Sequence, residues 1–89
     1  MTTALITHPD CLGHEPPEGH PEQVARLERV LAALLEKDLL RVTAPLVAED
    51  DLLRVHPKSY VEMIRDAAPA EGLAQLDADT WMSPGSLAA

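Results

Sequence analysis

Residues 14–26, HEPPEGHPEQVAR, carry the strongest conformational constraints in the chain. Two adjacent prolines and a glycine favour an irregular loop, because proline fixes φ and lacks an amide proton, whereas glycine adopts backbone angles that other residues avoid. Pro21 with Glu22 is typical of the first turn of a helix. The stretch therefore predicts a stiff loop that presents two imidazoles, those of His14 and His20, ahead of a helix.

The segments on either side have the patterns of short strands and helices. Residues 3–7 are apolar and partly β-branched, which predicts a strand leading into a loop at residues 8–20. Residues 21–37 predict a helix, because their apolar side chains recur at helical spacing, and residues 39–44 predict a second strand before Pro45. The apolar positions of the helix are Val24, Leu27, Val30, Leu31, Leu34 and Leu35.

More helices are expected in the second half of the chain. Residues 49–68 predict two short helices separated at Pro57, and the first begins with carboxylates that its dipole favours. Residues 77–86 predict a polar loop that contains the single tryptophan, Trp81. The order strand, helix, strand, helices is typical of the beginning of an α/β fold with a parallel sheet, although so few strands leave their direction open.

Length and composition favour a piece of a larger fold. A chain of 89 residues buries only about 60 to 65% of the surface that its unfolded form exposes. Its apolar content is 46%, yet it has one Trp, one Tyr and no Phe, so large aromatic anchors for a core are scarce. Residues 83–89, SPGSLAA, have the pattern of a turn and the first residues of a helix. We therefore expect the chain to be incomplete at its C-terminus.

Charge and hydropathy narrow the classes of partner. The chain has 15 acidic and 7 basic residues and a net charge of −8, with no basic cluster to follow a phosphate backbone, so we expect no direct nucleic-acid binding. No stretch has the pattern of a signal peptide or a membrane span, which predicts a cytoplasmic protein without membrane contact. The lone Cys11 excludes an internal disulfide and fits a reducing compartment. The oligomeric state is left open.

Histidine and cysteine side chains in and near the loop raise the question of a metal site. His14-Glu15 matches the start of the zinc-protease HExxH motif, but the next histidine, His20, follows six residues later and two prolines intervene. No helix can present both imidazoles on one face. Cys11, His14 and His20 remain weak candidate ligands for a structural zinc ion, and ordinary hydrogen bonding within the loop is the simpler interpretation.

Two other polar groups have both a structural and a functional interpretation. Arg26 lies four residues after Glu22, which predicts a surface salt bridge; alternatively it turns inward to hold loop carbonyls or a carboxylate, and periodicity favours the salt bridge. Asp77 and Asp79 beside Trp81 form either an ordinary turn or an acidic loop that accepts hydrogen bonds from a cationic or amide substrate.

Four segments in the same order resemble the N-terminal part of the histone deacetylase family, specifically bacterial class II deacetylases and acetylpolyamine amidohydrolases. They are an initial strand that ends at a histidine-containing loop; GHPEQVARL, residues 19–27; DLLRVHPKSYVEMI, residues 51–64; and DADTWMSPGSLAA, residues 77–89. The resemblance extends over nearly the whole chain, and the combination of segments is more specific than any one of them.

This resemblance implies an α/β fold, the three-layer arginase/deacetylase type with a parallel sheet, of which the chain holds the N-terminal portion. It implies hydrolysis of an acetylated amine, either acetyl-lysine or an acetylpolyamine, by a zinc ion that polarises the acetyl carbonyl and activates water. The zinc ligands, the tandem histidines and the catalytic tyrosine of the family match no residues in this chain. We therefore expect this chain to hold no catalytic residue, to bind no catalytic zinc and to be inactive alone.

The resemblance also assigns roles to individual residues. Arg26 matches an arginine that supports the active site by ordering loop carbonyls around an internal cavity. Asp79 matches a carboxylate at the rim of the substrate channel that binds the substrate. His20, Pro21 and Glu22 match the loop along one wall of that channel, and His20 also matches a structural zinc ligand of some relatives.

Two hypotheses of different class follow. In the first, residues 1–89 are the N-terminal part of a single deacetylase-like domain and supply substrate-channel loops. In the second, the chain is a small acidic helical module without catalysis, which binds a partner protein through the Leu-rich face of its residue 24–35 helix. The identity of the substrate is left open.

Overall fold

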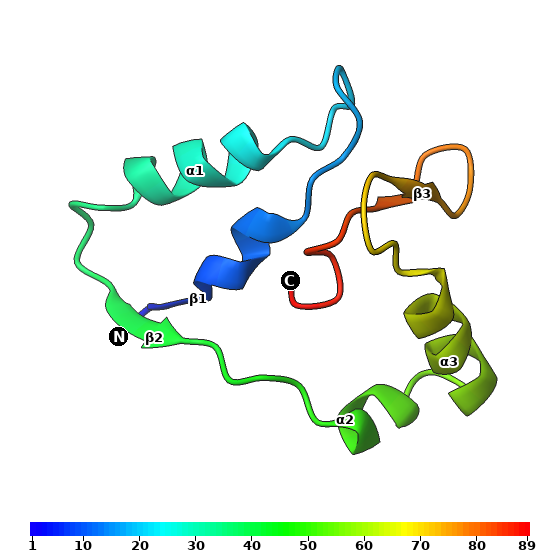
Figure 1. Ribbon diagram of the computed structural model, residues 1–89. Helices are drawn as coiled ribbons and strands as arrows, with labels where there is room; N and C mark the ends of the chain where they lie inside the picture. The colour runs from blue at the N-terminus through cyan, green and yellow to red at the C-terminus, as the bar shows by residue number, and fades with distance from the viewer.

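The computed structural model describes residues 1–89, and the chain forms a small mixed α/β structure with a two-stranded parallel sheet and three α-helices. One side of the molecule holds the parallel sheet and the first helix, and the other holds the remaining helices and a short hairpin (Figure 1). The elements in order are β1 (Ala4–Thr7), the 3₁₀ helix η1 (Pro9–Gly13), α1 (Val24–Ala33), β2 (Leu40–Thr43), α2 (Glu49–Leu53), α3 (Lys58–Ala67), β3 (Ala74–Gln75) and β4 (Trp81–Met82).

β1 and β2 confirm the expected α/β class and the parallel direction of the sheet. Ala4 pairs with Leu40 and Thr7 with Thr43, in register and in parallel. The chain between the two strands passes through η1 and α1, as parallel pairing requires a long crossover. Both strands are shorter than expected: β1 lacks residue 3, and β2 lacks residues 39 and 44.

Arg41 on β2 fastens the end of α1 to the sheet. Its Nη2 atom donates to the carbonyl oxygens of Leu34 and Leu35, both at 2.8 Å, and approaches that of Lys37 at 3.3 Å. These carbonyls belong to Leu34, which caps α1, and to the turn that follows it. A cationic donor near the C-terminal end of a helix is favourable, because that end carries partial negative charge. Arg41 therefore connects the turn after α1 to β2.

The helix expected at residues 21–37 is shorter than predicted. α1 begins only at Val24, after Gln23 with extended backbone angles of φ −130° and ψ 148°. The amide of Glu22 donates to Nδ1 of His20 at 3.1 Å, and such local side-chain bonds compete with helix formation. At the other end the chain passes into turns after Ala33, and Arg41 binds the carbonyls of Leu34 and Leu35 in the first of these turns.

The second half of the chain matches the expected pair of helices and adds a hairpin. α2 and α3 lie within residues 49–68, as predicted. Residues 77–86, expected to be a loop throughout, contain β4, and the predicted loop at 8–20 contains η1. β3 pairs with β4 in antiparallel register, with Ala74 opposite Met82.

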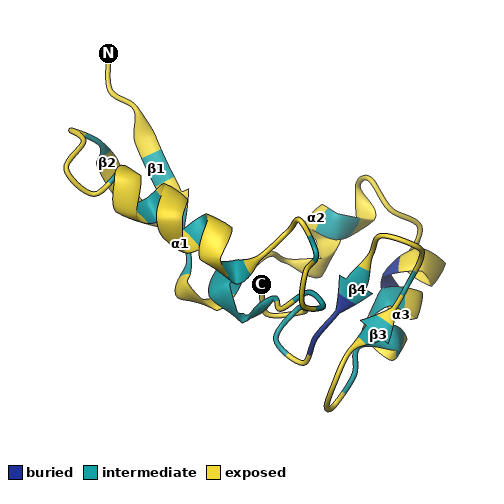
Figure 2. Cartoon of the chain, turned by 90° about the horizontal axis from the view of Figure 1, so that it is seen from above, coloured by how far each residue is buried: buried dark blue, intermediate teal, exposed yellow.

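Few residues are buried. Val61 on α3, Met82 on β4 and Ser83 are the three buried residues, and Figure 2 shows them clustered on one side of the molecule. Many large apolar side chains are exposed, including Ile6 at 62% and Leu35 at 70%. The apolar core therefore contributes little to holding the two sides of the molecule together. No helix has the length and hydropathy to cross a lipid bilayer.

We predict that Arg41→Gln lowers the free energy of unfolding by about 1–2 kcal/mol, because the carbonyls of Leu34, Leu35 and Lys37, at and just after the end of α1, lose a charged donor. Urea denaturation followed by far-UV circular dichroism measures this loss. Arg29→Gln is the matched control, since Arg29 lies on α1 itself and its side chain makes no hydrogen bond or ion pair. Equal losses in the two variants would contradict the role given to Arg41.

Candidate functional site

Ser83 joins the histidine-containing loop to the C-terminal turn. The residue is 2% exposed, and its hydroxyl accepts a hydrogen bond from the amide of Glu15 at 2.9 Å and donates to the carbonyl of Gly13 at 3.1 Å. The Ser83 amide donates to Oγ of Ser86 at 2.7 Å. This small polar side chain thus contacts Glu15 and Gly13, which precede it in the sequence by 68 and 70 positions.

Gly85 allows the backbone of the C-terminal turn to touch the loop. A Cβ atom at position 85 would overlap the carbonyl oxygen of Gly13 and lie 2.8 Å from its carbonyl carbon. The overlapping atoms belong to the backbone, which cannot move aside as a flexible side chain can. The absence of a side chain at Gly85 is therefore needed for the hydrogen bonds of Ser83 to form.

His14 belongs to the same network. Nδ1 of His14 lies 2.7 Å from Oγ of Ser86, which is itself 3.1 Å from Oγ of Ser83. The same Ser86 oxygen accepts from the Ser83 amide, so this one hydroxyl connects His14 with Ser83. Nε2 of His14 faces Oε2 of Glu22 at 3.9 Å.

His20 connects the loop to the acidic hairpin. Its Nδ1 accepts from the amide of Glu22, so its Nε2 carries the proton and donates to the carbonyl oxygen of Asp79 at 2.9 Å. The structure thus brings together His20 and Asp79, two of the residues predicted to bind substrate. Their contact uses the main chain of Asp79, which leaves the carboxylate free.

The turn between β3 and β4 is organised by Asp77. Its Oδ1 accepts from the amide of Asp79 at 2.9 Å, and the amide of Leu76 donates to the carbonyl of Thr80 at 2.8 Å. The backbone amide of Asp79 first, and the Thr80 side chain second, lower the pKa of Asp77 from its ordinary value. The Asp79 carboxylate makes no hydrogen bond or ion pair and is exposed, so it is available to a ligand.

Arg26 makes neither of the contacts considered for it. No salt bridge with Glu22 forms, because Glu22 precedes α1 and the helical spacing of four residues does not apply to this pair. The side chain is exposed and donates to no loop carbonyl. It does line a cavity of about 280 Å³ that also contacts Cys11, His14 and Glu22.

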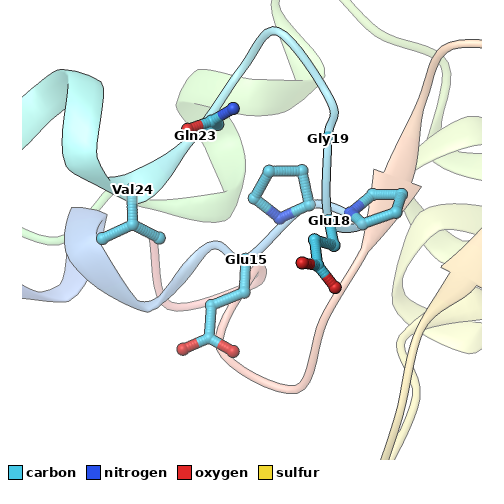
Figure 3. A pocket seen from close by; sticks show the side chains of 7 residues that line it. Glu15, Glu18, Gly19, Gln23 and Val24 are labelled. Carbon is cyan, nitrogen blue, oxygen red and sulfur yellow. The ribbon is translucent and has the colours of Figure 1, made fainter.

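The proline-rich loop encloses a separate, polar hollow of about 480 Å³. Figure 3 shows the loop arching beside the start of α1, with the carboxylates of Glu15 and Glu18 projecting on the same side. Pro21 does not line this hollow. The residues that line the hollow are Glu15, Pro16, Pro17, Glu18, Gly19, Gln23 and Val24.

The three weak candidates for a structural zinc ion are engaged elsewhere. His14 bonds to Ser86 and His20 bonds to Asp79 and Glu22, while Sγ of Cys11 lies 3.8 Å from the carbonyl of Ala89. No group of three or more His, Cys, Asp or Glu side chains is arranged to hold a metal ion. The structure therefore does not assemble Cys11, His14 and His20 into one site.

The residues that hold this region together were not among those predicted from the sequence. The junction between the loop and the C-terminal turn is formed by Ser83, Ser86 and the two touching glycines, Gly13 and Gly85. Sequence patterns indicated only a turn at Ser83-Pro84-Gly85-Ser86. The signal available was the pair of small hydroxyl residues flanking Pro-Gly. Nothing in the spacing indicates that their partners lie in the histidine-containing loop.

No known protein-family model matches the chain, and no curated protein sequence matches it significantly.

Replacing Gly85 with alanine should lower the free energy of unfolding by about 1–3 kcal/mol, because the new methyl group overlaps the Gly13 backbone. Thermal or urea denaturation measures the change. Gly13→Ala is the matched control, since a Cβ at Gly13 has its nearest neighbours at an ordinary 3.7 Å. If both alanine variants were equally stable, the close approach would not be a constraint on the fold.

The pKa of Asp77 predicts a pH-dependent contribution to stability. Because this pKa is lower in the folded chain than its ordinary value of 3.8, the contribution is present above pH 3.8 and is lost as the pH falls through the folded pKa. We expect Asp77→Asn to remove it, so that the variant and the wild type differ at neutral pH and converge in acid. Urea denaturation from pH 2 to 7 tests this, with Asp38→Asn as a control in an exposed residue that makes no hydrogen bond. A constant difference across the range would contradict the prediction.

Proposed function

We propose that this chain is the N-terminal segment of a zinc-dependent deacetylase-like amidohydrolase and that it supplies loops of the substrate channel. One observation carries the proposal: two segments that resemble the family, residues 19–27 and residues 77–89, meet in space. They meet through the bond from His20 to the Asp79 carbonyl. The preceding loop meets the same C-terminal segment through Ser83.

The proposed role of Asp79 is to bind the substrate at the channel rim. The bond from His20 and the bond from the Asp79 amide to Asp77 hold the backbone of Asp79 at both its carbonyl and its amide. Its carboxylate is left free, and an ionised carboxylate forms the stronger class of hydrogen bond with an amide or a cation. Acetyl-lysine peptides and acetylpolyamines both offer such donors.

Zinc does not fit the residues present in this chain. The family implies a catalytic zinc ion, yet no three donor side chains converge here, and the imidazoles of His14 and His20 are held by Ser86, Glu22 and Asp79. The proposal therefore assigns these residues no part in zinc chemistry. Their part is to shape and orient the loops beside which that chemistry would occur.

A second candidate function is the partner-binding helical module. The observation in its favour is exposed apolar surface on and next to α1, where Val30 is 47% and Leu35 is 70% exposed. Against it, α1 packs on η1, and Val24, Leu27 and Leu31 are already partly covered. The apolar face of α1 that stays exposed is therefore narrower than the face indicated by the sequence pattern.

The direct test is to read the coding DNA beyond the Ala89 codon and to assay the longest in-frame product. We expect tandem histidines and an Asp-x-His segment to follow, and zinc-dependent hydrolysis of acetyl-lysine or acetylpolyamine substrates by the longer product. Residues 1–89 alone should be inactive. A stop codon directly after Ala89, with a stable monomeric 89-residue product, would contradict the proposal and favour the partner-binding module.

In the longer product, Asp79→Asn should lower kcat/KM by about 10- to 100-fold, the loss expected when a charged hydrogen bond to the substrate is weakened. Steady-state kinetics on both substrate classes measures the effect. Asp66→Asn is the control, because Asp66 is exposed on α3 and makes no hydrogen bond or ion pair. An unchanged kcat/KM in Asp79→Asn would contradict the role of the rim carboxylate.

A further inference from the structure

An apolar groove lies between α3, the β3–β4 hairpin and the C-terminal turn, away from the hollow beneath the proline-rich loop. Its volume is about 400 Å³, within the range of small-molecule sites. Val61 and Ile64 of α3 form part of its wall, and Trp81 and Met82 of β4 form another part. The His56 and Tyr60 rings, stacked with centroids 5.1 Å apart, also line it.

The side chains that line the groove differ in charge from the rest of the chain. The chain has 15 acidic residues, yet no Asp or Glu is among the residues that line the groove. The groups there that can carry positive charge are His14, His56 and Arg65. A ligand with an apolar body and a negative end is therefore complementary to this surface, whereas an apolar cation is not.

Arg65 is the residue best placed to bind the negative end. Its Nη1 atom donates to Oε1 of Glu49 at 2.7 Å, and its other guanidinium N–H groups have no hydrogen-bond partner. A guanidinium has five donors in a fixed fork, so it can hold a second carboxylate alongside the first. The side chain is about half exposed, at 48%, and is accessible from the groove.

We propose that this groove binds an aliphatic carboxylate, with the hydrocarbon chain against Val61, Ile64 and Trp81 and the carboxylate on Arg65. The site does not rest on the proposed deacetylase function, because it uses none of the residues assigned to the substrate channel. It gives the chain a ligand of its own, of the fatty-acid class.

The test is a titration of the 89-residue chain with octanoate, followed by the fluorescence of Trp81, the only tryptophan. We expect a saturable shift of the emission with one octanoate bound per chain. Octylamine and octanol should bind at least tenfold more weakly, because they lack the carboxylate. Hexanoate should bind about tenfold more weakly than octanoate, since it buries two fewer methylenes.

Two variants distinguish specific binding of a carboxylate from non-specific binding to an apolar surface. Arg65→Gln should weaken octanoate binding about tenfold, while Glu49→Gln, which breaks the same ion pair and keeps the arginine, should bind octanoate at least as tightly as the wild type. The pair of variants controls for any loss of stability from the ion pair itself. Equal binding of octanoate and octylamine, equal weakening in both variants, or the lack of any saturable change would overturn the proposal.

Discussion

The hydrogen bonds of the buried Ser83 hydroxyl to Gly13 and Glu15 are the contact on which the arrangement of the molecule depends. Val61 and Met82, the only buried apolar residues, lie on α3 and β4, so their burial stabilises the hairpin side and does not join it to the sheet side. A short-range polar network therefore decides how the sheet side and the hairpin side meet. Such a network tolerates little displacement, because a buried hydroxyl without its partners costs free energy. Gly85 supplies the close approach that the network needs.

Local features of this fold could be predicted from the sequence, and long-range ones could not. Apolar periodicity and β-branched runs placed α1, β1 and β2 near their observed positions, because these signals depend on neighbouring residues. The start of α1 was predicted too early, since periodicity does not register the side chain of His20 taking the Glu22 amide. His20 and Asp79, each predicted separately to bind substrate, lie in contact, but through the Asp79 carbonyl. The Ser83 junction and the position of Arg26 depend on where distant backbone atoms lie, which no local pattern encodes.

The parallel sheet explains why so much apolar surface is exposed. Sheets of parallel strands normally have both faces covered by helices. The sheet of this chain has only two strands of four residues each, so it is smaller than most sheets. Here Ile6 is 62% and Leu40 is 56% exposed, and alternate backbone groups of both strands point away from the pairing. These surfaces are what a segment of a larger α/β domain would present.

The bonds of Arg41 also bear on the order in which the chain assembles. They span only 4 to 7 residues, whereas the bonds of Ser83 to the loop span 68 and 70. The entropy lost on closing a loop grows with its length, and contacts between distant residues form more slowly. We therefore expect the turn from α1 to β2 to become ordered early, as a local unit, and the junction with the C-terminal turn to form last. During synthesis, the histidine-containing loop would then leave the ribosome well before the residues that fix its position.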